Sequence, residues 1–239
     1  MRGRVLREGL MDRKRVDQYR FALFGRMVMG VAHEVDNYLS VIMGFAELIQ
    51  ISGAGEKKSL DSVGKILHAG ERINNIIKHF SYYVRPHAPL REPFSPADMV
   101  GECIVFSRFD LGRNNVTLVL PESYPAGFLN GDRRDIALTL LALLFNGAEA
   151  MAEQGGGVLK LEASRGDGFW EFAVTDEGAG IPPGITTRIF EEGFSTKNGP
   201  ANNGMGLPVA RCLAGEMGGT LYVENLPGGG CGAVLRIPG

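Results

Sequence analysis

Apolar residues recur at alternating steps of four and three along the first part of the chain. Every position of this series from residue 24 to residue 49 is apolar, namely Phe24, Val28, Val31, Val35, Tyr38, Ile42, Phe45 and Ile49. Such a heptad-like stripe is typical of one helix face that pairs with another helix. The chain has no proline between residues 14 and 51, and SGAGE at 52–56 ends the pattern. We therefore expect a helix over about 14–51.

A second apolar stripe follows, from about residue 57 to residue 83. Its positions are Val63, Ile66, Gly70, Ile73, Ile77 and Phe80, and it stops before Pro86. Two long helices joined by a short turn form an antiparallel hairpin. Because one hairpin does not cover both stripes, we expect two copies to pair as a homodimeric four-helix bundle.

The pattern changes after PHAPLREPFSP (86–96), whose four prolines predict a stiff, extended linker and a domain boundary. Helices are expected over 97–109, 133–153 and 207–217, with strands at 116–121, 158–164, 170–176, LYVEN and AVLRIP. This order predicts an α/β sandwich, with helices on one face of a sheet. The whole chain is then α+β: a basic tail and helix start (1–19), the hairpin (20–85), the linker (86–96) and the sandwich (97–239).

Composition and net charge limit which partners and which cellular compartment fit the chain. The chain has 239 residues and a net charge of −2, which argues against nucleic acid as its main partner. The basic run from Arg2 to Arg15 is interpreted as a solvated tail. The three cysteines form no CxxC pair, so we expect neither zinc nor disulfides, and a reducing cytoplasm. FALFGRMVMGVA is interrupted by Arg26 and too short to span a bilayer, so no membrane span is expected.

Three polar residues share a small part of the first helix. If Val28, Val31 and Val35 face the partner helix, His33 falls at the most solvent-facing position. Asn37 lies one turn further on, and Glu34 lies beside His33. A solvated helix face is the simplest interpretation of this stretch by itself. The sequence HEVDN does not match the zinc-binding HExxH pattern, because Asn37 stands where the second histidine would be.

Four pieces of the second region carry residue types suited to binding a ligand. An asparagine inside an apolar helix needs a polar partner, and glycines after an aspartate or before a helix let a ligand approach the main chain. The pieces are Asn146 in LLALLFNGAEAM, Asp176 with Gly178 and Gly180 in TDEGAGI, Phe190, Phe194 and Lys197 in RIFEEGFSTK, and Gly204 and Gly206 in NNGMGLPVA. No Walker A loop or GxGxxG motif occurs.

The order and spacing of these pieces resemble the ATP-binding (Bergerat) domain of the GHKL superfamily, which includes gyrase, Hsp90, MutL and histidine kinases. HEVDN on a helical hairpin resembles the phosphoacceptor and dimerisation domain of two-component sensor histidine kinases. The resemblance covers about residues 20–239. It implies an ATP- and Mg²⁺-dependent protein histidine kinase that phosphorylates His33, transfers the phosphoryl group to a response regulator receiver domain, and also dephosphorylates that regulator.

The resemblance also assigns roles to residues. His33 would attack the γ-phosphate, Glu34 would take a proton from the imidazole, and Asn37 would orient water during dephosphorylation. The remaining roles fall on the second region: Asn146 would hold magnesium, Asp176 would read adenine, Gly178, Gly180, Gly204 and Gly206 would line the pocket and lid, and Phe190, Phe194 and Lys197 would anchor the lid.

The chain departs from the family pattern at four positions. Tyr38 replaces the proline after Asn37, Ala142 replaces an asparagine one turn before Asn146, Asn202 replaces a glycine of the last motif, and Gly232 stands near a usual threonine. Two alternatives therefore stay open. The chain is a phosphotransfer adaptor with a degenerate second domain, or it is a chaperone-like or repair ATPase, which leaves HEVDN unexplained.

Overall fold

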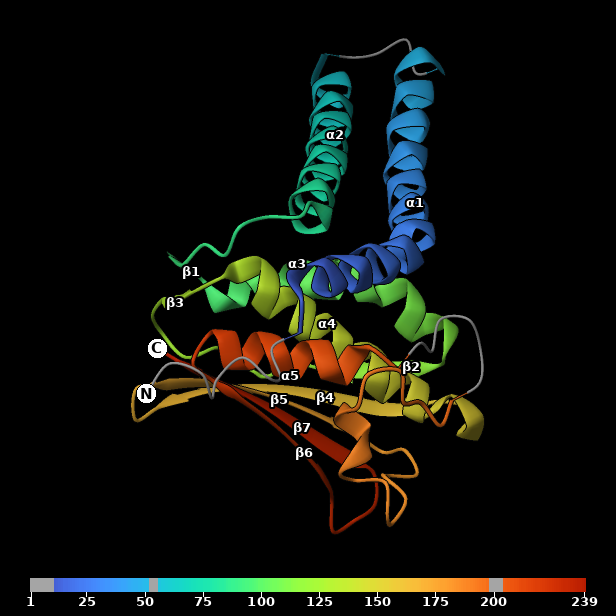
Figure 1. Ribbon diagram of the computed structural model, residues 1–239. Helices are drawn as coiled ribbons and strands as arrows, with labels where there is room; N and C mark the ends of the chain where they lie inside the picture. The colour runs from blue at the N-terminus through green and yellow to red at the C-terminus, as the bar shows by residue number, and fades with distance from the viewer. Residues whose placement is uncertain (1–10, 52–55, 198–203) are drawn as a thin grey trace.

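The computed structural model describes residues 11–51, 56–197 and 204–239. The predicted turn SGAGE, except for Glu56, and residues 198–203, which include Asn202, lie outside these residues. Helices α1 (Arg13–Ile51) and α2 (Glu56–Val84) lie side by side as a hairpin (Figure 1). Both helices begin and end within one residue of the prediction.

The inner face of the hairpin follows the predicted stripe on α1 but not fully on α2. On α1 the stripe from Val31 to Ile49 is half-buried, whereas Val28 is 48% exposed. On α2 the prediction is wrong for Val63 and Ile77, which are 41% and 51% exposed, while Ala69 and Ile76 are buried. Helix α2 carries apolar residues over a wider arc than one partner helix covers, so neighbouring positions compete for the inner face.

The first part of α1 packs on the second domain and, through Phe24, on Phe80 and Tyr83 at the end of α2. Figure 1 shows this darker blue part lying across the helices of the second domain, while the rest of α1 rises beside α2. Its buried residues are Val16, Tyr19, Arg20, Leu23, Phe24, Met27 and Gly30. Arg13 pairs with Asp135 and Glu216, and Arg15 pairs with Glu192. The expected solvated tail is therefore wrong for Arg13, whereas the side chain of Arg15 is 55% exposed.

Three helices cover one face of a five-stranded sheet, as the sequence predicts (Figure 1). The helices are α3 (Pro96–Arg113), α4 (Arg133–Ala150) and α5 (Gly206–Glu216). The strand order is β2-β4-β5-β7-β6, with bounds Val116–Val119, Gly157–Gly166, Phe169–Asp176, Cys231–Pro238 and Thr220–Asn225. Strand β2 runs parallel to β4, and the other neighbours are antiparallel.

Part of the predicted linker is a strand. Residues Glu92–Phe94 form β1, which pairs with β3 (Leu129–Gly131) in a separate two-stranded sheet. Two short 3₁₀ helices, Ala152–Gln154 and Arg188–Phe190, complete the described elements. A three-residue strand that contains Pro93 carries no periodic signal, which is why the sequence pattern did not indicate it.

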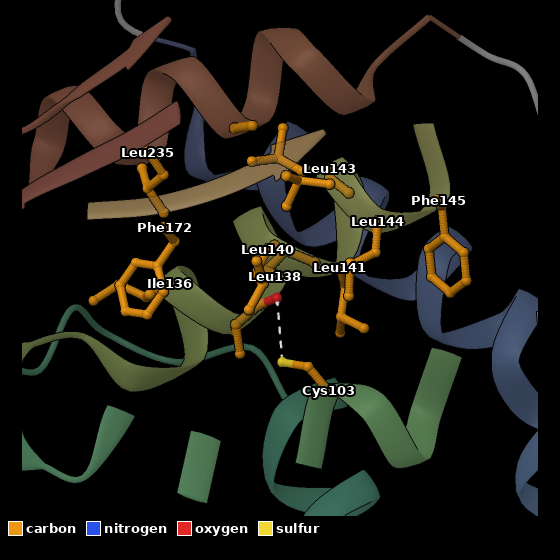
Figure 2. Close-up of a cluster of buried hydrophobic side chains, with 14 of the residues drawn as sticks. Cys103, Ile136, Leu138, Leu140, Leu141, Leu143, Leu144, Phe145, Phe172 and Leu235 are labelled. Carbon is orange, nitrogen blue, oxygen red and sulfur yellow. Dashed lines mark hydrogen bonds between the residues drawn. The ribbon is translucent and has the colours of Figure 1, made fainter. Parts of the chain in front are cut away.

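Helix α4 forms the centre of the second domain. Its leucines from Leu138 to Leu144 are almost fully buried and belong to the same hydrophobic core as Phe172 and Leu235 of the sheet (Figure 2). The stretch Arg133–Gln154 is long and apolar enough to cross a bilayer by length and composition. However, 78% of its most apolar window is buried inside the protein, as expected of a core helix.

The start of α4 joins the linker and the first part of α1. Asp132 caps α4 and accepts hydrogen bonds from His87 Nε2 at 3.0 Å and Leu90 N at 2.8 Å. Burial raises the pKa of Asp132, but these hydrogen bonds outweigh it and hold the pKa below its usual value. One turn on, Asp135 accepts a hydrogen bond from the fully buried Arg20 at 2.6 Å.

Candidate functional site

A cavity of about 320 Å³ lies where α4, α5 and the ends of β5 and β7 meet α1. Most of the site residues expected from the sequence line it, namely Asn146, Asp176, Gly180, Phe194, Lys197, Gly204 and Gly206. Its size is that of a typical small-molecule site. Residues separated by up to sixty positions in the sequence thus meet in one place.

Asp176 stands at the end of β5 as a fixed hydrogen-bond acceptor. Its Oδ1 accepts hydrogen bonds from the main-chain N–H groups of Gly178 at 2.9 Å and Cys231 at 3.3 Å. Burial raises the pKa of this carboxyl group, and the two N–H groups partly oppose that shift. Gly147 lets α4 approach the sheet, because a Cβ there would lie only 2.5 Å from Cδ1 of Leu159 on the neighbouring strand β4.

Glycines keep the main chain close to the cavity. Gly180 and Gly204 adopt φ values of 73° and 63°, a region that side-chain-bearing residues rarely occupy. A Cβ on Gly206 would lie 3.2 Å from the hydroxyl of Tyr19 and 3.4 Å from Nδ2 of Asn146. A side chain on the first residue of α5 would therefore crowd the hydroxyl of Tyr19, which favours glycine at this position.

Charged and amide groups gather at one part of the cavity, which we call the polar corner: Arg26, Asn146, Glu149 and Lys197. Lys197 Nζ donates to the main-chain oxygen of Asn146 at 3.0 Å and to Glu149 Oε2 at 3.1 Å. Glu149 also accepts a hydrogen bond from Arg26. Glu149 was not singled out from the sequence, although it lies on α4 one turn after Asn146.

Two of the residues expected in the second region, Gly178 and Phe190, do not line the cavity. Gly178 supplies its N–H to Asp176, so it acts on the cavity through that carboxylate. Phe190 lies under the guanidinium of Arg211, 4.3 Å from the ring centre. Phe194, which does line the cavity, lies under Arg188 at 4.2 Å. The two phenylalanines therefore sit in different surroundings.

Helix α1 supplies a wall that the sequence motifs did not indicate. Tyr19, Ala22, Leu23 and Arg26 all line the cavity. The only hint of this wall in the sequence is that Arg26 interrupts an apolar run. An arginine in such a place is as often exposed to solvent as it is part of a binding site. The contact between α1 and α4 joins residues more than one hundred positions apart, which no local pattern reports.

The polar trio of α1 lies outside the cavity. His33 and Asn37 are exposed, and Nδ1 of His33 is 3.3 Å from Nδ2 of Asn37. The His33 ring lies 5.8 Å from that of Phe109 on α3. Glu34 is half-buried and 3.7 Å from Arg108. The histidine thus faces outward from the hairpin, as the heptad pattern predicts.

The fold and the cavity define a class of ATP-binding domain. Residues 131–239 match the family described as histidine kinase-, DNA gyrase B-, and HSP90-like ATPase, so this part of the chain is a GHKL-type ATPase domain. ATP binding follows from that family. The chain as a whole is homologous to two-component sensor histidine kinases.

Two curated relatives illustrate this homology. Sporulation kinase A of Bacillus subtilis (strain 168) is 23% identical over 98% of this chain and 38% of its own length. Sensor histidine kinase ZraS of Escherichia coli O157:H7 is 26% identical over 100% of this chain and 50% of its own length. The chain therefore spans half or less of the length of these relatives.

A solved structure shares the fold across both domains. Histidine kinase ThkA, solved in complex with response regulator protein TrrA, aligns with a TM-score of 0.53 at 22% identity. The alignment covers 99% of this chain and 68% of that one. At this identity the likeness concerns the fold: a helical hairpin followed by a GHKL-type domain.

Proposed function

We propose that the chain is an ATP-dependent protein histidine kinase that phosphorylates His33 and passes the phosphoryl group to an aspartate of a response regulator receiver domain. One observation carries the proposal: a single chain holds an exposed imidazole on a hairpin helix and a cavity that joins Asp176 to the polar corner. Neither part alone distinguishes a kinase from an adaptor or from another ATPase of the family.

In the proposed reaction, a ring nitrogen of His33 attacks the γ-phosphorus of ATP. An N–P bond forms, the bond from that phosphorus to the bridging oxygen breaks, and ADP leaves. The other ring nitrogen must lose a proton, and the carboxylate of Glu34, the next residue, is the proposed acceptor. His33 lies outside the cavity in this arrangement, so transfer requires the catalytic domain to shift along α1 or to serve the other copy of a dimer.

The cavity residues have separate proposed roles in holding the nucleotide. Asp176 accepts a hydrogen bond from the adenine amino group, and Gly178, Gly180, Gly204 and Gly206 let the main chain approach the ligand. Phe190, Phe194 and Lys197 anchor the lid.

Mg²⁺ fits the polar corner. Asn146 and Glu149 offer oxygen atoms one turn apart on α4, and Mg²⁺ prefers such ligands. When bound there, the ion would neutralise charge on the phosphate oxygens. We propose Asn146 as its main protein ligand.

The partners are a response regulator and a second copy of the chain. ThkA was solved with a response regulator protein, which supports the first. Apolar side chains exposed along the hairpin support the second; they include Leu39, Met43, Leu60, Leu67 and Ile77. Asn37 beside His33 is the proposed residue that orients water when the chain dephosphorylates the regulator. The free thiols Cys103, Cys212 and Cys231 fit a reducing, cytoplasmic compartment.

The test is phosphorylation with ATP labelled at the γ-phosphate. We expect acid-labile label on the parent chain and none on His33→Ala, with His68→Ala as the control because His68 is an exposed histidine on α2. Label retained by His33→Ala would contradict the site. Asn37→Ala is expected to lose phosphatase activity and keep kinase activity.

A phosphotransfer adaptor remains the second candidate, since Ala142 stands where the family has an asparagine. Ala142 is buried and does not line the cavity, so this position offers no amide group to a ligand. Calorimetry with Mg-ATP separates the two candidates, because an adaptor with a degenerate domain binds no nucleotide.

A further inference from the structure

Arg26 is held rigidly at the edge of the cavity by three neighbours. Its Nε donates to Asp110 Oδ1 at 3.1 Å, and its Nη1 donates to Glu149. The guanidinium also lies 4.5 Å from the centre of the Phe145 ring. Contacts on three sides fix the orientation of a side chain that is otherwise flexible.

The remaining side of Arg26 faces the cavity. A guanidinium has five N–H donors, and the two ion pairs engage Nε and Nη1. Within the described parts of the chain, no hydrogen bond to Nη2 is found. Arg26 lines the cavity and retains 21% side-chain exposure, so the free donors are accessible to a ligand there.

The surroundings of Arg26 suit an anion. Lys197 is a second cation in the polar corner, and the carboxylate of Glu149 lies between the two positive side chains. Helix α5 begins at Gly206, which also lines the cavity, and the start of a helix carries partial positive charge. A planar, preoriented guanidinium matches the geometry of phosphate oxygens and can bind them with two parallel hydrogen bonds.

We propose that Arg26 is a nucleotide-binding residue supplied by the helix that carries His33, and that it contacts the terminal phosphate of ATP. This inference rests on the proposed function. The terminal phosphate is the one that must face α1 for transfer to His33. Arg26 precedes His33 by seven residues, which is two helical turns or about 10 Å. Nucleotide binding is thereby coupled to the position of α1.

The proposal predicts which ligands lose affinity when Arg26 is changed. Calorimetry with Mg²⁺ should show that Arg26→Gln binds the non-hydrolysable analogue AMPPNP at least about tenfold more weakly than the parent chain. A loss of this size is expected because one charge-assisted hydrogen bond to the ligand is removed. ADP affinity should fall less than about threefold and adenosine affinity should not change. Arg26→Lys should lie between Arg26→Gln and the parent chain.

Arg15→Gln is the matched control. Arg15 also joins α1 to the second domain, through Glu192, but it does not line this cavity. We expect it to bind AMPPNP, ADP and adenosine like the parent.

Three outcomes would overturn the role of Arg26: unchanged AMPPNP affinity, an equal loss for all three ligands, or tighter AMPPNP binding. If the parent chain itself binds no AMPPNP, the proposed function fails instead.

Discussion

Asp176 has an ionisation state that should control nucleotide affinity. Because burial raises the pKa of its carboxyl group, Asp176 takes up a proton at a higher pH than an exposed aspartate. The protonated acid is a poorer acceptor for an amino group, so the affinity it provides is present above this pKa and lost as the pH falls through it. We expect AMPPNP binding by the parent chain to weaken between pH 7.5 and pH 5, measured by calorimetry.

Substitution of Asp176 tests whether this carboxyl group, and not another titrating group, causes the pH dependence of AMPPNP binding. Asp176→Asn should bind AMPPNP at least about tenfold more weakly at pH 7.5 and show little further loss at pH 5. Glu177→Gln is the control, since Glu177 is exposed and does not line the cavity. A full pH dependence retained by Asp176→Asn would assign the titration to another group.

Single residues also show how far sequence reasoning reaches. The order and spacing of Asn146, Asp176 and the glycines resemble those of the GHKL domain, and this resemblance predicts that they meet in one pocket. Arg26 and Glu149 could not be found in this way. Their pairing depends on how α1 lies across α4, a contact between parts of the chain more than one hundred residues apart.

At the scale of elements, two glycines of α1 have opposite predicted effects. A Cβ on Gly30 would lie 2.7 Å from the Cβ of Phe109, so Gly30→Ala must push α1 away from α3. We expect a loss of about 1–3 kcal/mol in the free energy of unfolding, typical of overpacking. Gly44 has nothing within 4 Å of its Cβ position, so Gly44→Ala should add about 0.5–1 kcal/mol.

Urea denaturation followed by helix circular dichroism measures both changes. Because both glycines lie within the same helix, the comparison removes any shared effect of helix propensity. Equal stabilisation by the two substitutions would mean that α1 does not pack on α3 in solution.

The helices illustrate why element bounds are easier to predict than faces. The absence of proline and the run of apolar steps fix α1 and α2 closely, since these signals are local. The face of α2 was assigned partly wrongly, because Ala69 and Ile76 compete with Gly70 and Ile77 for the same neighbour. Strand β1 was missed, as only pairing with β3 makes residues 92–94 a strand.

At the scale of the whole molecule, Arg20 connects three parts of the chain. Its side chain is fully buried, with Nη2 bonded to Asp135 on α4 and Nη1 bonded to the main-chain oxygen of Tyr83 at the end of α2. A buried arginine needs such partners, because an unpaired buried charge is costly. Arg20 thus holds the base of the hairpin against the domain that contains the cavity, and nothing in the local sequence distinguishes it from a solvated arginine.

The outer face of the hairpin predicts the state of association. Leu67 is 63% exposed on α2, and Met43 is 62% exposed on α1, although apolar side chains of this size are usually covered. A second hairpin packed on this face would bury them and complete a four-helix bundle. We expect sedimentation velocity to show a dimer for the parent chain and mainly monomer for Leu67→Glu, because the bundle would have to bury an unpaired carboxylate.

Leu90→Glu is the matched control for this substitution. Leu90 is also exposed, at 53%, but it lies in the segment between α2 and β1, outside the hairpin. The Leu90→Glu variant should therefore remain dimeric. The helix circular dichroism of both variants should match that of the parent chain. A monomeric parent chain, or a Leu67→Glu variant as dimeric as Leu90→Glu, would place the contact between copies elsewhere. Since His33 lies on the same hairpin, a dimer formed there brings two copies of His33 and two cavities into one molecule.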